Sequence, residues 1–365
     1  MPELRDLEPV GVGLRVTTSP TQTVFYIILV LLGIVGNATV VGVIGDSVFK
    51  DPSRGHNSDI ILINMALSNL LVSVLRNVLL VISDLGMEVR SWMGLGQGSG
   101  TVVGHAMKNE GCMWVLETRG RKLNSSRDWC HVLMGVWVWL RSVNVWSTLF
   151  LSAFHFQTLR RVAPLPGTVQ GPHRPPKTLL ISLGLIWSLN LIYAIPAHIY
   201  STNGNKNSTE TLMVVSSTTR PLLGCVWNFP SSYDGLAYAT TSMVIHEILP
   251  IILMAITNLG SLYTLYTHGR TRNPAHMTQD VPVIKRVPAE RRAAKVILAL
   301  IVLFIASWGT SIISINYFNY NRGSSAGFLL VIARFANTIF IAISPIVLAV
   351  GHRRLRAVIK SFLTH

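Results

Sequence analysis

The stretch Thr23–Gly45, TVFYIILVLLGIVGNATVVGVIG, is 23 residues long and contains no charged side chain. A helix of this length crosses a hydrocarbon core of about 30 Å, because each residue adds about 1.5 Å. Lipid offers no partners to backbone amides, and an uninterrupted apolar run is typical of a helix rather than of a barrel strand. Six comparable runs follow along the chain: Asp59–Ser83, Cys130–Phe156, Lys177–Ile199, Leu236–Tyr266, Ala293–Tyr317 and Ser325–Val350. The chain is therefore predicted to be an all-α membrane protein, a seven-transmembrane helix bundle over residues 23–350.

The composition agrees with a membrane protein. Half of the 365 residues are hydrophobic, 13% are charged, and the mean hydropathy is +0.45. These values are unusual for a soluble domain. One bundle and its connectors use up the whole length, so no separate soluble domain is expected.

The net charge of +15 could indicate a nucleic-acid partner, but its distribution argues against one. If the N-terminus is outside, the inner connectors and the tail carry 16 Lys and Arg residues and the outer segments carry 11. This positive-inside bias predicts an extracellular N-terminus, a cytoplasmic tail and contact with anionic lipids, in a multi-pass protein of the plasma membrane. Residues 1–22 include Glu3, Asp6 and Glu8 and lack an apolar core of signal-peptide length, so the first run is expected to serve as an uncleaved insertion signal.

Two of the three cysteines lie at the outer side under this orientation. Cys130 begins the third run and Cys225 lies in the loop between the fourth and fifth runs. A disulfide persists on that side, so we expect the pair to tie the loop over the mouth of the bundle. Asn207, in the same loop, starts an Asn-Ser-Thr sequon and is a predicted glycosylation site.

Short motifs indicate which group of seven-helix proteins the chain resembles. The first run contains Gly36-Asn37 and the second contains LINMALSNL at 62–70, whereas the third ends in SAFHFQTL at 152–159 where the majority of rhodopsin-like receptors have Asp-Arg-Tyr. The sixth run has ASWGT at 306–310 and the seventh has ISPIVL at 343–348, again departing from the majority pattern.

These departures form a pattern of their own. With LRSVNVWST at 140–148, LSAFH at 151–155 and the Ser344-Pro345 pair, the chain resembles the vomeronasal type-1 receptor family. Within that family it is most similar to the fish olfactory receptors related to class A. Bitter taste receptors depart in similar ways and remain an alternative. The resemblance implies a G protein-coupled chemosensory receptor for pheromones or odorants, which binds a small molecule in the outer half of the bundle and activates a heterotrimeric G protein of the inhibitory type.

Ionisable residues inside the runs mark the candidate ligand site, because an unpaired charge in hydrocarbon is costly. Arg141, Glu247 and Arg334 lie within the third, fifth and seventh runs. They could neutralise one another, for example Arg141 or Arg334 against Glu247, or an arginine could grip an acidic ligand bidentately. For Arg76, with Asp84 two turns away, we favour pairing within the bundle. Trp137 is a candidate cavity residue, although tryptophan in membrane helices more often serves packing or anchoring.

At the inner side, four residues are predicted to meet the G protein: His155, Arg160 and Arg161 at the end of the third run, and Lys295 near the start of the sixth. Lipid-headgroup anchoring is the alternative for Lys295. The tail 351–365 is predicted to form an amphipathic helix, with Leu355, Val358, Ile359 and Phe362 on one face.

The outer segment 87–127 does not fit the resemblance. It has about 40 residues, many glycines and six basic side chains, and it shows no periodicity. A disordered insertion and a gene-model artefact both explain it, and we assign it no role in ligand binding.

Other functional classes fit less well. A transporter would be expected to show repeated halves with matching broken helices, and a channel would need a pore lining. The sequence shows no zinc-ligand spacing, nucleophile elbow or phosphate-binding glycine loop. We therefore expect neither catalysis nor a cofactor.

Overall fold

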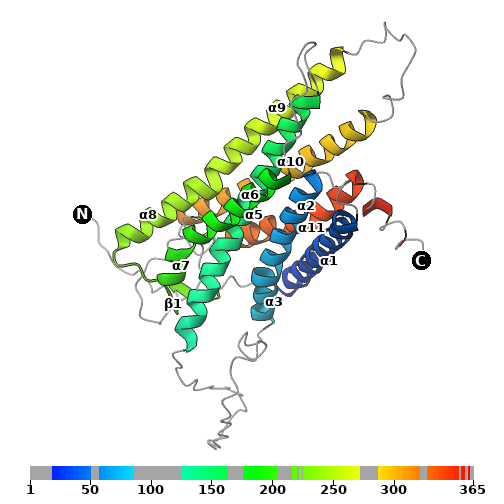
Figure 1. Cartoon of the computed structure of the whole chain (residues 1–365). Helices are drawn as coiled ribbons and strands as arrows, with labels where there is room; N and C mark the ends of the chain where they lie inside the picture. Colours follow the sequence, from blue (N-terminus) through cyan, green and yellow to red (C-terminus); the bar gives the residue numbers. More distant parts are fainter. Residues whose placement is uncertain are drawn as a thin grey trace, which may run out of the picture.

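The computed structural model is a bundle of long helices (Figure 1). It describes residues 19–50, 57–85, 125–162, 176–203, 216–219, 222–223, 225–271, 287–320, 327–352, 355–357 and 361. The first two spans are α1 (Pro20–Lys50) and the continuous unit of α2 (Asn57–Val72), η1 (Ser73–Val78) and α3 (Leu79–Asp84). The third is α5 (Ser125–Val162), and the fourth comprises α6 (Pro176–Tyr193) and α7 (Ile195–Ile199).

The remaining spans follow a short two-stranded sheet. Strands β1 (Ser201–Asn203) and β2 (Cys225–Trp227) are antiparallel, with Thr202 opposite Val226. The fifth span comprises α8 (Ser232–Met243), η2 (Val244–Ile248) and α9 (Leu249–Thr271). The sixth is α10 (Val287–Tyr320) and the seventh is α11 (Gly327–Gly351). In the described part of the chain, six of these seven units are long and apolar enough to cross a membrane by length and composition, and α5 is the exception.

Helix α5 lies at the centre of the bundle, which explains its polarity. It contacts α2, α6, α7, α9, α10 and β1, so protein rather than lipid surrounds much of it. Polar side chains at such positions are tolerated because neighbouring helices satisfy them. Seven polar side chains are buried on the described part of α5: Arg141, Ser142, Asn144, Ser147, Thr148, Ser152 and His155.

An asparagine network joins four spans in the middle of the bundle. Asn144 of α5 donates to Asn69 Oδ1 of α2 at 2.6 Å, and Asn69 donates to Ser344 Oγ of α11 at 3.3 Å. Asn37 of α1 donates to the carbonyl of Ile341 at 2.9 Å. That carbonyl has no helical partner, because Pro345 lacks the N–H that would otherwise bond to it. The Asn37 amide therefore satisfies a backbone group that the proline leaves free.

Two spans contain a π-helical turn, and each turn carries buried ionisable or polar groups. Turn η1 holds Arg76 and Asn77, and η2 holds His246 and Glu247. In η2 the cause is visible in the sequence, because Pro250 cannot bond to the carbonyl of His246 and its ring crowds that carbonyl. Turn η1 has no proline, and nothing in the local sequence accounts for it.

The structure moves several predicted boundaries. Helix α5 begins at Ser125, inside the segment 87–127 that was predicted to be a loop, and α10 begins at Val287 rather than at Ala293. Hydropathy detects the apolar part of a helix and misses polar turns that extend it beyond the membrane. The rest of the segment, residues 87–124, lies outside the described residues, as do residues 1–18, which we predicted to be extracellular. Val358, Ile359 and Phe362 of the tail also lie outside them, whereas Leu355 of the tail is buried.

Candidate functional site

Arg141 is a fully buried guanidinium near the middle of α5. It donates to Asn337 Oδ1 of α11 at 2.8 Å, and its guanidinium carbon lies 3.3 Å from the ring centre of Trp308 on α10. Its Nε has no partner among the described residues. A guanidinium carries five N–H donors and a full positive charge, and here it meets an amide and an aromatic face rather than a carboxylate.

A chain of hydrogen bonds leads from Arg141 toward Glu247. Asn337 Nδ2 donates to Ser311 Oγ of α10 at 2.9 Å, and Ser311 Oγ lies 3.3 Å from Ser217 Oγ in the loop between β1 and β2. The neighbouring Ser216 donates to Glu247 Oε1 at 2.7 Å. Arg141 and Glu247 attract each other electrostatically, but no ion pair within 4.0 Å joins them. These hydrogen bonds therefore connect Arg141 to Glu247 although the two side chains do not touch.

The loop residues 216–219 form a plug in the bundle, since all four are buried. The amide N–H of Thr218 donates to Glu247 Oε1 at 2.9 Å, and Trp227 Nε1 donates to the carbonyl of Thr219 at 2.8 Å. The predicted disulfide between Cys130 and Cys225 is present and ties β2 to α5. The plug is thus held from two sides and covers Glu247.

Arg334 differs from Arg141, because it has a carboxylate partner. Its Nη2 lies 2.5 Å from Asp84 Oδ2, and its guanidinium carbon lies 3.8 Å from the ring centre of Tyr26. The pairing of Arg334 with Glu247 that we considered from the sequence does not occur. An internal partner reduces the need for an acidic ligand at Arg334, so its role in binding stays a prediction that the geometry does not favour.

Trp137 and Arg76 complete the set of buried polar groups around Arg141. The Trp137 ring is within cation–π distance of both arginines, and its Nε1 has no partner among the described residues. Arg76 is buried without an ion pair to any described acid, although we expected it to pair within the bundle. Asp84 is bonded to Arg334 instead.

Sequence reasoning did not identify the neutral members of this site. Asn337, Ser311 and the plug residues are short polar side chains in an apolar or loop context, where each resembles many others. Trp308 was noticed only as part of a motif. The signal that could have found them is distance in space, which the sequence does not give.

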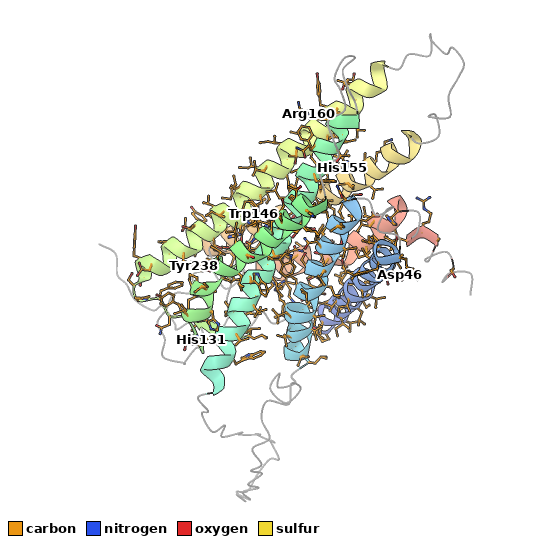
Figure 2. The ribbon with its side chains drawn as sticks, viewed as in Figure 1. Asp46, His131, Trp146, His155, Arg160 and Tyr238 are labelled. Atoms are coloured by element: carbon orange, nitrogen blue, oxygen red, sulfur yellow. A yellow bond between two sulfur atoms is a disulfide. The ribbon has the colours of Figure 1, made fainter. Side chains whose placement is uncertain are left out.

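Three of the predicted G protein contacts, His155, Arg160 and Arg161, lie near the C-terminal end of α5, where His155 and Arg160 are labelled in Figure 2. Arg160 and Lys295 are exposed, as a contact requires. His155 is buried, which argues against direct contact in this conformation. The Arg161 side chain and the glycosylation candidate Asn207 lie outside the described set.

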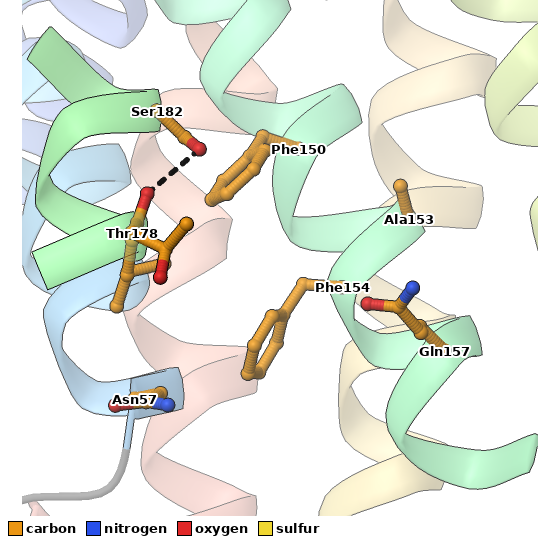
Figure 3. Close-up of a pocket in the computed structure, with 8 residues that line it drawn as sticks. Asn57, Phe150, Ala153, Phe154, Gln157, Thr178 and Ser182 are labelled. Atoms are coloured by element: carbon orange, nitrogen blue, oxygen red, sulfur yellow. Dashed lines mark hydrogen bonds between the residues drawn. The ribbon is translucent and has the colours of Figure 1, made fainter. Parts of the chain in front are cut away.

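A hollow of about 210 Å³ opens beside the second half of α5 (Figure 3). It lies between α5, the beginning of α2 and the beginning of α6, with Phe150, Phe154 and Leu179 among its lining residues. It contains none of the predicted ligand-site residues, so it is separate from the polar site at Arg141.

Comparison with known proteins decides the class. Residues 126–346 match the family described as 7 transmembrane receptor (rhodopsin family). The chain belongs to this receptor family. The receptor is also 38% identical over 343 residues to olfactory receptor class A-like protein 4 of Danio rerio, covering 94% of this chain and 89% of the relative.

Membership confirms the seven-helix fold and makes the chain a G protein-coupled receptor rather than an enzyme. Such a receptor is a multi-pass membrane protein with a ligand on one side and a G protein on the other. The buried site around Arg141 lies inside the bundle, where side chains of α5, α10 and α11 meet. It is therefore the candidate ligand site of this receptor.

Proposed function

We propose that the receptor detects small acidic odorants or pheromones, and that Arg141 binds the acidic group of the ligand. It belongs, on this proposal, to the vomeronasal type-1-like receptors of the olfactory system, and a bitter-taste role is the alternative that its motifs leave open. The similarity to a fish olfactory receptor class A-like protein supports the chemosensory role. The finer assignments come from the motifs of the sequence.

One observation supports the acidic ligand most directly. The Arg141 guanidinium is 1% exposed and has no carboxylate within 4.0 Å among the described residues. Burial of a charge without a charge of opposite sign beside it costs several kcal/mol, whereas a bidentate carboxylate would offset that cost. Trp137 and Glu247 then flank the ligand, and the plug residues 216–219 must yield or rearrange to admit it.

Signalling on this proposal runs from the buried site to the inner end of the bundle. The N-terminus is outside, and Arg160, Arg161 and Lys295 meet a heterotrimeric G protein of the inhibitory type. An N-terminal epitope tag that antibodies reach on intact cells supports this orientation, and a tag that requires permeabilised cells contradicts it.

The test is a signalling assay in cells that carry a promiscuous G protein. The receptor is challenged with small carboxylic acids, their primary amides, amines and steroids, and surface levels are measured through the tag. We expect activation by one or more acids, with the acid more potent than its amide, and loss of this preference in Arg141→Gln. The matched control is Lys50→Gln, which removes an exposed charge on α1 and should leave potency unchanged. An acid preference that survives in Arg141→Gln at normal surface level contradicts the proposal.

A further inference from the structure

Arg76 is a second buried guanidinium that the receptor leaves without an acid. It lies on the π-helical turn η1, its side chain is 5% exposed, and its Nε has no hydrogen-bond partner in the described chain. π-helical turns often occur at functional sites, because they rotate one side chain out of the ordinary helical register. The turn therefore directs a charged group into the bundle where a regular helix would place another residue.

Arg76 and Arg141 share one aromatic neighbour. The Trp137 ring centre lies 5.0 Å from the Arg76 guanidinium carbon and 5.6 Å from that of Arg141. The two guanidinium groups repel each other, and Arg334 adds a further repulsion at Arg76. Cation–π contact offsets part of the cost of burying these charges, but it does not remove the repulsion between them. An anion between the two groups would remove it.

On the two arginines and on the two tryptophans that they contact, Trp137 and Trp308, the buried atoms without partners are all nitrogens. Four of the buried nitrogens without a partner in the described structure belong to this group of residues: Arg76 Nε, Arg141 Nε, Trp137 Nε1 and Trp308 Nε1. Each can donate a hydrogen bond, and none can accept one. Buried polar groups are normally satisfied, so a group of donors without acceptors suits a ligand that is rich in acceptors. A carboxylate, with two oxygens and about four lone-pair sites, supplies that need.

We propose that Arg76 and Arg141 together hold one carboxylate of the ligand, with the indole N–H groups of Trp137 and Trp308 as further donors. This inference deepens the proposed function, on which it rests, by adding Arg76 as a second binding arm and by fixing the orientation of the ligand. The acid end lies beside Trp137. The remainder of the ligand extends toward the plug and Glu247, whose Oε1 is bonded to Ser216 and Thr218.

The decisive experiment measures acid-to-amide selectivity in Arg76→Gln. Benzoate, hexanoate and their primary amides are the first probes, and the most potent acid of the panel follows with its own amide. We expect the variant to lower the acid-to-amide potency ratio by about tenfold or more, with amide potency unchanged, because only the acid uses the second charge. The acid-to-amide potency ratio of Arg76→Lys should fall between those of wild type and Arg76→Gln. Lysine keeps the positive charge but lacks the planar guanidinium that donates two parallel hydrogen bonds to a carboxylate. A purely structural role would weaken acid and amide alike and leave the ratio unchanged, which overturns the inference.

The two proposals fail in different ways. A ratio that falls in Arg141→Gln but stays within about twofold of wild type in Arg76→Gln overturns the second arm and leaves Arg141 as the acid site. A ratio that changes in neither variant overturns both. If Arg76→Gln does not reach the cell surface, Arg76→Lys is used for the decision.

A binding measurement decides the matter without an agonist. Thermal unfolding of the purified receptor is compared in sodium phosphate and in sodium chloride of equal ionic strength, because an anion that binds the folded state raises the unfolding temperature. Phosphate also stabilises folded proteins in general, because it is excluded from their surface. The stabilisation by phosphate should therefore be larger in wild type and Lys50→Gln than in Arg76→Gln and Arg141→Gln. Stabilisation that persists in full in Arg76→Gln, or that is missing in wild type, contradicts the two-arginine site.

Discussion

Glu247 shows how much a single residue's surroundings decide. Its Oε1 accepts from Ser216 Oγ and from the N–H of Thr218, whereas Oε2 has no partner among the described residues. The carboxylate attracts Arg141 without touching it. An acidic ligand at Arg141 therefore competes with Glu247 for the same positive charge.

Glu247→Gln should make acidic ligands more potent. Glutamine keeps an acceptor for the plug and removes the negative charge that opposes the ligand, so potency should rise by about tenfold if the lost repulsion is about 1.4 kcal/mol. The signalling assay with an activating acid measures the change, and the matching amide serves as the control because it carries no charge. A loss of acid potency would instead indicate that Glu247 itself binds the ligand.

Between elements, Asn37 replaces a helical hydrogen bond that Pro345 removes. Its amide donates to the Ile341 carbonyl at 2.9 Å and to the Gly33 carbonyl at 2.8 Å, thereby joining α1 to α11. Asn37→Ala should lower the free energy of unfolding by about 1–3 kcal/mol, because the buried Ile341 carbonyl then keeps only the long contact of 3.4 Å from Ser344 Oγ. In Pro345→Ala the backbone N–H of residue 345 can donate to the Ile341 carbonyl. Asn37→Ala should therefore cost less stability in the Pro345→Ala background than in wild type. Thermal unfolding of the four purified proteins measures the cycle, and equal costs in both backgrounds would contradict this role.

Gly36 sets how closely α1 approaches α11. A Cβ at Gly36 would lie 2.8 Å from Pro345 Cγ, whereas a Cβ at Gly42 of the same helix meets nothing within 4 Å. Gly36→Ala should destabilise the receptor by about 1–3 kcal/mol through overpacking. Gly42→Ala should be neutral or stabilising, since alanine favours a helix by about 1 kcal/mol over glycine. Similar unfolding temperatures for the two variants would show that the helices can separate without cost.

In the whole molecule, the segment between β1 and β2 is tied to two elements that are far apart in the sequence, α5 and η2. The Cys130–Cys225 disulfide closes a segment of 95 residues, and the plug residues 216–219 fill the bundle beside it. The loop therefore lies against the candidate ligand site and contributes hydrogen bonds to Glu247. Loss of the disulfide would give the unfolded chain more conformations, and in the folded receptor it would leave residues 216–219 less firmly held.

Replacing both cysteines by serine should lower the stability of the receptor by about 2–5 kcal/mol, since a long closed segment restricts the unfolded chain strongly. Surface level and unfolding temperature are the measurements. Each single variant should lose as much as the double variant, because either one breaks the same bond. A double variant that unfolds like wild type would mean that the plug and the β1–β2 pairing suffice to hold the loop.

The sequence by itself determined the seven spans, the disulfide pair and the buried charges, because each can be recognised from residue types and their positions along the chain. Apolar runs such as Thr23–Gly45 have the length of a membrane, and Arg141 stands out as a charge within one. Only the tertiary structure decided which charges are paired. Asp84 is bonded to Arg334 and not to Arg76, and the plug rather than an arginine covers Glu247. The physical reason is that ion pairs and hydrogen bonds depend on distances between spans, and two π-helical turns change the direction of Arg76 and Glu247 in a way that periodicity does not reveal.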